Sequence, residues 1–181
     1  MKKIILICIT AIATCSLSAQ IYVAKTCDIS FFSHFTVEDI SAHNTVAKPM
    51  LNTATGAVQM RITMAKFEFK SPLMQEHFNE NYVESEKFPY AEYKGKINEP
   101  VDYTKDGDTK VTVTGKFTIH GVEQERIIDG LISIKNGEIT ISSTFNIHVA
   151  DYNIKVPSLY VTTIGEDMET KINAVLVPFK K

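Results

Sequence analysis

Few side chains in this sequence have the types and spacing that chemistry requires. His77 and Glu80 stand three residues apart in a segment with helical spacing, which would place two metal-binding groups on one helix face. The sequence supplies no second pair that could complete a metal site, so a solvated helix face explains these two residues better. We therefore expect no metal ligands and no resident cofactor.

The other polar residues do not form a catalytic arrangement. His120 falls at an expected turn and His148 on the polar face of an expected strand, so we expect both at the surface. The acidic run 84–86 is expected to be solvated, because adjacent carboxylates on a strand point to opposite faces. The sequence contains neither the Gly-x-Ser-x-Gly motif of α/β-hydrolases nor a Gly-rich phosphate-binding loop. We therefore predict no catalytic residues and a protein that is not an enzyme.

The first 19 residues have the pattern of a secretory signal peptide. A basic start is followed by an apolar run and then by small residues that end at Ala19. We expect cleavage after Ala19, so that residues 1–19 are the leader and residues 20–181 form one exported domain. Lipid attachment at Cys15 is the alternative, but Thr14 is bulkier than a lipoprotein site prefers.

Cys27 is the only cysteine beyond that leader. A lone thiol in an exported protein could react, or could pair with a second chain, which leaves a homodimer open. The residues around Cys27 form no activating motif of histidine, cysteine or basic side chains. We therefore expect Cys27 to be a small buried apolar residue.

Composition narrows the classes of protein further. The chain has 181 residues, of which 44% are hydrophobic, and these values fit one folded domain and exclude global disorder. It carries 19 lysines and arginines against 21 acidic residues, and its isoelectric point is near 6.2. A dedicated nucleic-acid binder would need a basic face, so we expect no nucleic-acid partner.

After residue 20, alternating apolar and polar residues predict an all-β domain. His120-Gly121 and Asn136-Gly137 are typical of two-residue hairpin turns between long strands. Eight antiparallel strands avoid free edges best by closing into a barrel, which can hold one small ligand. A two-sheet sandwich shows the same alternation and stays open as an alternative. About eight strands are predicted, over residues 22–33, 37–46, 57–69, 92–98, 110–119, 122–134, 139–149 and 168–179.

One segment breaks this pattern and predicts a short amphipathic helix. Ser71 can cap its start, and Pro72 suits the first helical position. Phe88-Pro89 marks the return to extended chain. In a closed barrel, such a helix would cover a mouth or the outer wall. The residues that recur at helical spacing are Leu73, Met74, His77, Phe78 and Tyr82.

Three pieces of the sequence resemble the YceI-like family and occur in the family's order. Residues 74–85 with the following Lys87-Phe88-Pro89 resemble its helix and strand entry, and residues 113–122 resemble its central hairpin. A third piece, formed by Phe145, residues 151–154 and residues 164–167, resembles the region before its last strand. The resemblance covers roughly residues 57–179, whereas the first strands lack the tryptophan that the family often carries.

The resemblance implies a lipocalin-like eight-stranded antiparallel β-barrel with a long apolar tunnel. It also implies binding of a polyisoprenoid chain, such as an isoprenoid quinone or a polyprenyl lipid, in the bacterial periplasm. A transient membrane contact is compatible with such a ligand. Aliphatic and aromatic side chains should line the tunnel, and our candidates are Phe67, Met74, Phe78, Val113, Phe117, Phe145, Ile147 and Tyr152.

Each of these residues also has a purely structural interpretation. The apolar candidates could fill a dry core, and Met74 with Phe78 could form a gate instead. The Tyr152 hydroxyl could lie near a lipid head group or bond to a strand end. The sequence therefore leaves three functions open: a lipid carrier, a filled-core interaction or structural module, and a small lipid-metabolism enzyme.

Overall fold

The computed structural model describes residues 20–33, 39–155 and 167–179, which fold mainly into antiparallel strands. The leader expected over residues 1–19 lies outside the described residues. No helix among the described residues is long and apolar enough to cross a membrane. In chain order the elements are β1 Ile21–Ser33, β2 Ile40–Asn44, β3 Met50–Asn52, β4 Ala57–Thr63, η1 Met64–Lys66, β5 Glu68–Phe69, α1 Pro72–His77, η2 Phe78–Tyr82, β6 Tyr90–Ile97, β7 Gly107–Ile119, β8 Val122–Lys135, β9 Glu138–His148, η3 Val149–Tyr152 and β10 Asp167–Pro178.

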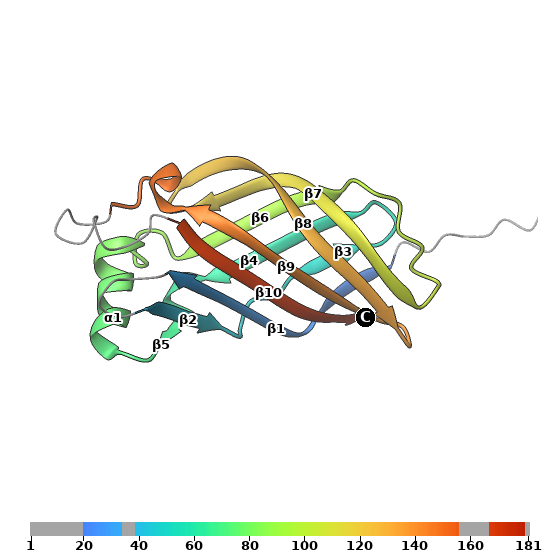
Figure 1. Ribbon diagram of the computed structural model, residues 1–181, viewed down its shortest axis with the longest axis horizontal. Helices are drawn as coiled ribbons and strands as arrows, with labels where there is room; N and C mark the ends of the chain where they lie inside the picture. Colours follow the sequence, from blue (N-terminus) through green and yellow to red (C-terminus); the bar gives the residue numbers. More distant parts are fainter. Residues whose placement is uncertain (1–19, 34–38, 156–166, 180–181) are drawn as a thin grey trace, which may run out of the picture.

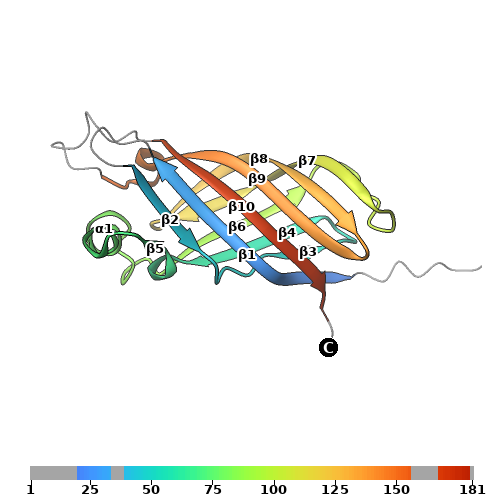
Figure 2. The same ribbon diagram turned by 60° about the horizontal axis from the view of Figure 1, so that its bottom comes forward.

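The strands close into an eight-stranded antiparallel barrel. The ring runs β10-β9-β8-β7-β6-β4-β3-β1, and pairing of β1 with β10 along residues 22–32 completes it. β2 pairs with the second half of β1, and β5 pairs with β2, so these two short strands extend the sheet at one end. Figure 2 shows β10, β1 and β2 side by side. The predicted barrel is therefore confirmed, and the sandwich alternative is wrong.

One predicted strand is interrupted, and one observed strand has no counterpart among the predictions. The strand expected over residues 37–46 is present as β2 within the described residues, and β3, which no prediction covered, follows it on the same edge of β1. Between them, Asn44 Oδ1 accepts from the Val46 amide at 3.1 Å, and Pro49 has no amide hydrogen to donate. The strand expected over residues 57–69 is divided by the turn η1, whose start is tied to the carbonyl of Pro89.

The two predicted hairpin turns are confirmed. His120 and Gly121 have φ angles of 51° and 74°, and Asn136 and Gly137 have φ angles of 52° and 79°. Positive φ at both central residues is the type I′ geometry that matches the twist of paired strands. The first turn joins β7 to β8 and the second joins β8 to β9.

The predicted helix is confirmed at one end of the barrel (Figure 1). Ser71 caps α1 by accepting from the Met74 amide at 3.4 Å, and Pro72 opens the helix. The segment continues as the π-helical turn η2. Helical spacing predicts Leu73 on the apolar face, but this prediction is wrong: Leu73 is 60% exposed, because that side of α1 faces solvent. Met74 and Phe78 face the barrel instead.

Alternation along the strands puts one apolar set inside the barrel. Isoleucine and leucine side chains at 0–1% exposure form its centre, including Ile29, Leu51, Ile132, Ile139 and Leu176. Cys27 lies on the same face of β1 and is only 6% exposed, as expected for a small buried apolar residue. Close packing of these side chains holds the ring together from within.

The two type I′ turns provide a matched test of packing at the helix end. A Cβ atom on Gly121 would lie 2.6 Å from Phe88 Cε1, whereas one on Gly137 would have no neighbour within 4 Å. Gly137→Ala should cost only the left-handed backbone strain, about 1 kcal/mol. Gly121→Ala should cost at least about 1 kcal/mol more through overpacking. Equal losses in urea unfolding would show that Phe88 does not restrain this turn.

Candidate functional site

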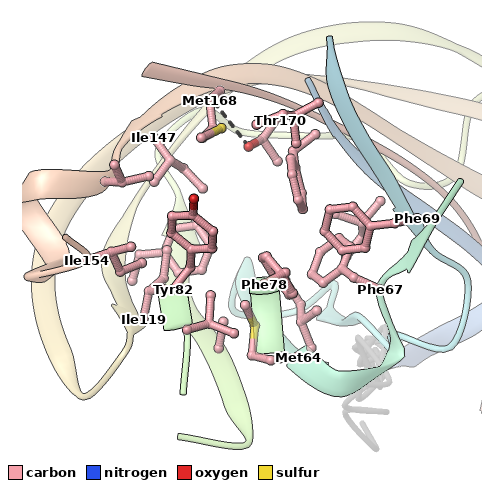
Figure 3. A pocket seen from close by; sticks show the side chains of 18 of the residues that line it. Met64, Phe67, Phe69, Phe78, Tyr82, Ile119, Ile147, Ile154, Met168 and Thr170 are labelled. Atoms are coloured by element: carbon pink, nitrogen blue, oxygen red, sulfur yellow. Dashed lines mark hydrogen bonds between the residues drawn. The ribbon is translucent and has the colours of Figure 1, made fainter. Parts of the chain in front are cut away.

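An apolar cavity of about 120 Å³ lies between the helical segment and the barrel interior (Figure 3). We call it the mouth cavity. Among its lining side chains, only Tyr82 and Thr170 carry a polar atom, and the Thr170 hydroxyl donates to the Met168 carbonyl at 3.4 Å. Its lining consists of Ile29, Phe31, Ile40, Ile62, Met64, Phe67, Phe69, Met74, Phe78, Tyr82, Val83, Ala91, Phe117, Ile119, Ile147, Val149, Ile154, Met168 and Thr170.

Four phenylalanines form the part of this lining that faces the helix. Phe78 stacks on Phe31 at 5.6 Å between ring centroids and contacts Phe69 at 4.9 Å. Phe67 meets Phe31 edge to face at 5.1 Å and Phe78 at 5.7 Å. The rings come from β1, η2, β5 and the residue before β5, so the cluster fixes the helical segment over the mouth cavity. Such aromatic surfaces suit a hydrocarbon ligand.

A second apolar cavity of about 70 Å³ lies deeper in the barrel, and we call it the inner cavity. Its lining consists of Pro49, Val58, Met60, Tyr93, Ile97, Val111, Val113, Phe117, Ile128, Asp129, Gly130, Ile132, Ile141, Ser143, Phe145, Ile172 and Ala174. The Tyr93 hydroxyl donates to the Val113 carbonyl at 2.9 Å, so this polar atom is satisfied within the wall.

Phe117 is the one residue that lines both cavities. It is 2% exposed, and its ring contacts Tyr93 at 5.6 Å, Phe145 at 6.2 Å and Tyr152 at 6.3 Å. The Phe117 side chain therefore separates the mouth cavity from the inner cavity.

The predicted lining residues fall into three groups. Phe67, Met74, Phe78 and Ile147 line the mouth cavity, Val113 and Phe145 line the inner cavity, and Phe117 lines both. Tyr152 lines neither cavity. It is 0% exposed, and its ring packs behind Phe117. Contact of any of these residues with a ligand stays a prediction.

Several residues of the mouth cavity are not among the predicted lining residues, including Phe31, Phe69 and Ile119. Ile119 shares the inward face of β7 with Phe117, so strand alternation alone would have found it. Arg126, which lines neither cavity, also has an inward position that no prediction covered. It lies opposite Gly115 on the inward face of β8, and its guanidinium donates to the Asn146 carbonyl at 2.5 Å.

The expectation that His120 is a surface residue is wrong. Its side chain is 12% exposed, and the Phe88 ring covers it at 4.5 Å between centroids. Its Nδ1 lies 3.1 Å from the Tyr152 carbonyl oxygen, and its Nε2 lies 2.8 Å from a carboxylate oxygen of Glu84. The Glu84 side chain is 44% exposed, so it is solvated as expected while it also contacts His120. His120 ties the β7–β8 turn to η3 and to the chain before β6.

Burial holds three groups, Tyr93, Tyr152 and Cys27, in their neutral forms. Burial raises the pKa of Tyr93 to about 12 and also raises the pKa of Tyr152. Burial raises the pKa of the Cys27 thiol to about 11, and the charge of Asp28 adds to this effect. No group of three or more metal-binding side chains gathers among the described residues. The site therefore offers apolar surface rather than reactive groups.

Cys27 should resist thiol reagents as long as the barrel is folded. At pH 8 only about one thiol in a thousand is ionised when the pKa is near 11, and the thiolate is the reactive form. In a Cys8→Ser, Cys15→Ser background, a disulfide reagent should label Cys27 slowly in buffer and quickly in denaturant. Rapid labelling of the folded protein would contradict this placement.

Comparison with known proteins places this architecture in one family. The YceI-like domain matches residues 22–176. A polyisoprenoid-binding domain from Saccharophagus degradans, implicated in plant cell wall breakdown, has a similar structure, with a TM-score of 0.73 and 15% sequence identity over 87% of this chain and 98% of that chain.

Two further solved structures are similar. BcnA of Burkholderia cenocepacia gives a TM-score of 0.69 at 17% identity, over 82% of this chain and 95% of that chain. The YceI protein of Campylobacter jejuni gives 0.55 at 18% identity, over 82% and 85%. At these identities the structures show the shared fold. The search among curated proteins found no match. The family match spans most of the chain, and the chain therefore belongs to the YceI-like family.

Proposed function

We propose that this protein binds and carries the apolar chain of an isoprenoid lipid, such as an isoprenoid quinone or a polyprenyl lipid, inside its barrel. The observation that carries the proposal is the pair of apolar cavities that meet at Phe117. The structurally similar Saccharophagus degradans domain is a polyisoprenoid-binding domain, which supports the same ligand class. The protein would act by sequestration, without a chemical step.

Burial of hydrocarbon would supply the affinity. Each buried CH₂ group contributes about 0.8 kcal/mol, so one five-carbon isoprene unit contributes about 4 kcal/mol before losses. Ordering of the flexible chain removes part of this gain. A few buried isoprene units are therefore enough for tight binding, provided that the wall leaves no polar group without a partner.

A long chain requires the two cavities to open. The mouth cavity of about 120 Å³ is smaller than the engineered apolar cavity of about 150 Å³ that binds one benzene molecule. The inner cavity adds only about 70 Å³. Binding would therefore move Phe117 and the phenylalanines beneath the helical segment. The described structure is the closed form of the proposed carrier.

We also propose that the protein is exported and works in the bacterial periplasm. The basic and apolar pattern of residues 1–19 supports this location. A soluble carrier must load and unload at a membrane, so a transient membrane contact is part of the proposal. The small cavities favour one competing function, that of a filled-core interaction module, which would bind no lipid.

Neighbouring residues of α1 provide a matched test of lipid binding. Met74 lines the mouth cavity, whereas Leu73 is 60% exposed. Met74→Asp places a charge against the apolar chain and should weaken binding of farnesol at least tenfold. Leu73→Asp should leave binding within twofold of the original protein. Titration calorimetry gives the affinities, and thermal unfolding verifies that both variants fold. Equal effects, or no binding of farnesol by the original protein, would contradict the proposal.

A further inference from the structure

The main-chain pairing between β8 and β9 ends well before either strand does. It joins residues 131–135 of β8 to residues 138–142 of β9. In contrast, β8 is paired with β7 as far as Val122, and β9 is paired with β10 as far as His148. We call the stretch where β8 residues 122–130 face β9 residues 143–148 the seam. The seam has no ladder pair in the described structure, and both strands can be followed in Figure 1.

Side chains, rather than main-chain pairs, hold the seam closed. Ser143 Oγ donates to the Asp129 carbonyl at 2.5 Å, and Arg126 Nη2 donates to the Asn146 carbonyl at 2.5 Å. Gln124 Nε2 of β8 donates to the carbonyl of residue 151, which lies beyond the end of β9, at 2.9 Å. Each bond can break by rotation of one side chain, so the seam can part while the neighbouring ladders stay intact.

The inner cavity and a groove on the protein surface lie on opposite sides of the barrel wall at this seam. A groove of about 770 Å³ lies on the outer wall across β1, β10, β9, β8 and β7, and we call it the outer groove. The outer groove and the inner cavity share the residues Val111, Asp129, Gly130, Ser143 and Ile172. Only one layer of residues therefore separates an apolar interior from a polar exterior.

Gly130 makes this wall thin. Its position on β8 points inward, but it has no side chain to fill the space. A Cβ atom there would lie 3.4 Å from the Ser142 carbonyl oxygen and 3.8 Å from Val111 Cγ2, which are ordinary contacts. An alanine would fit, whereas a larger side chain would extend into the inner cavity from this part of the wall.

We propose that the seam is a lateral portal for an amphiphilic lipid, with the apolar chain in the inner cavity and the polar head in the outer groove. This inference rests on the proposed function, and it adds the route of lipid entry and the position of the polar head group. The outer groove carries two lysines, Lys110 and Lys171, and three carboxylates, Asp28, Glu99 and Asp129. This mixed lining fits a neutral head that forms hydrogen bonds through oxygen, and it disfavours a diphosphate.

A reversible cross-link tests the portal. The β8–β9 ladder ends at Leu131 and Ser142, and if its register were extended, Asp129 would lie opposite Thr144 on the outer face of the seam. In a background without the native cysteines, a disulfide between Asp129→Cys and Thr144→Cys should slow uptake of a benzoquinone with two isoprene units at least tenfold. Reduction should restore the rate. The control disulfide, between Ser133→Cys and Thr140→Cys in the paired ladder, should leave the rate unchanged.

The outcomes separate this inference from the proposed function. Equal uptake rates for the oxidised and reduced seam variant, measured by quenching of tyrosine fluorescence, would overturn the portal alone. No uptake by either reduced protein or by the original protein would overturn the proposed function and the portal with it. Gly130→Val gives a second test, because it should slow uptake at least tenfold while Gly130→Ala should not.

Head-group preference tests the second half of the proposal. Farnesol and farnesyl diphosphate carry the same chain and differ only in the head. The neutral alcohol should bind at least tenfold more tightly than the diphosphate at physiological salt. Equal or tighter binding of the diphosphate would overturn the assignment of a neutral head to the outer groove.

Discussion

Closure of the sheet by the pairing of β1 with β10 is the constraint on which the rest of this structure depends. The ladder runs from Tyr22 opposite Pro178 to Phe32 opposite Glu169 and joins the first strand of the domain to the last. An open sheet of this length would expose one apolar face and two edges. Once the ring is closed, every inward-facing side chain meets the others in one enclosed interior. The cavities exist because this interior is not completely filled.

Aromatic rings divide the barrel interior and close it at the end beneath the helical segment. Phe117 divides the space, while the phenylalanines around Phe78 cover the end beneath the helical segment. His120 fixes the neighbouring turn through Glu84 and the Tyr152 carbonyl. The wall is strong where main-chain ladders are continuous and weak at the seam, where side chains replace them. An apolar interior lined by aromatic rings and a wall that lacks ladder pairs at the seam together suit a carrier that must take up and release its cargo.

The barrel could be predicted from the sequence because its main signals are local. These signals are the alternation of apolar and polar residues along each strand and the two glycine-containing hairpin turns. The splitting of β2 from β3 depends on Asn44, whose amide also donates to the Thr63 carbonyl across the fold. The environment of His120 depends on a carboxylate 36 residues away in the sequence. The inward position of Arg126 could have been predicted, because it has the same parity as Ile128. The seam could not, because it depends on where two twisted strands part.

Mass spectrometry of lipids extracted from the protein, purified from the cells that naturally make it, tests the central claim most directly. The account predicts about one polyisoprenoid per protein chain, retained by the folded protein and lost after denaturation. A folded protein that carries no such lipid, and that also fails to take up added isoprenoid quinones or prenols, would contradict the account. The barrel would then be a filled module, and its two cavities would be packing defects around Phe117 rather than a binding site.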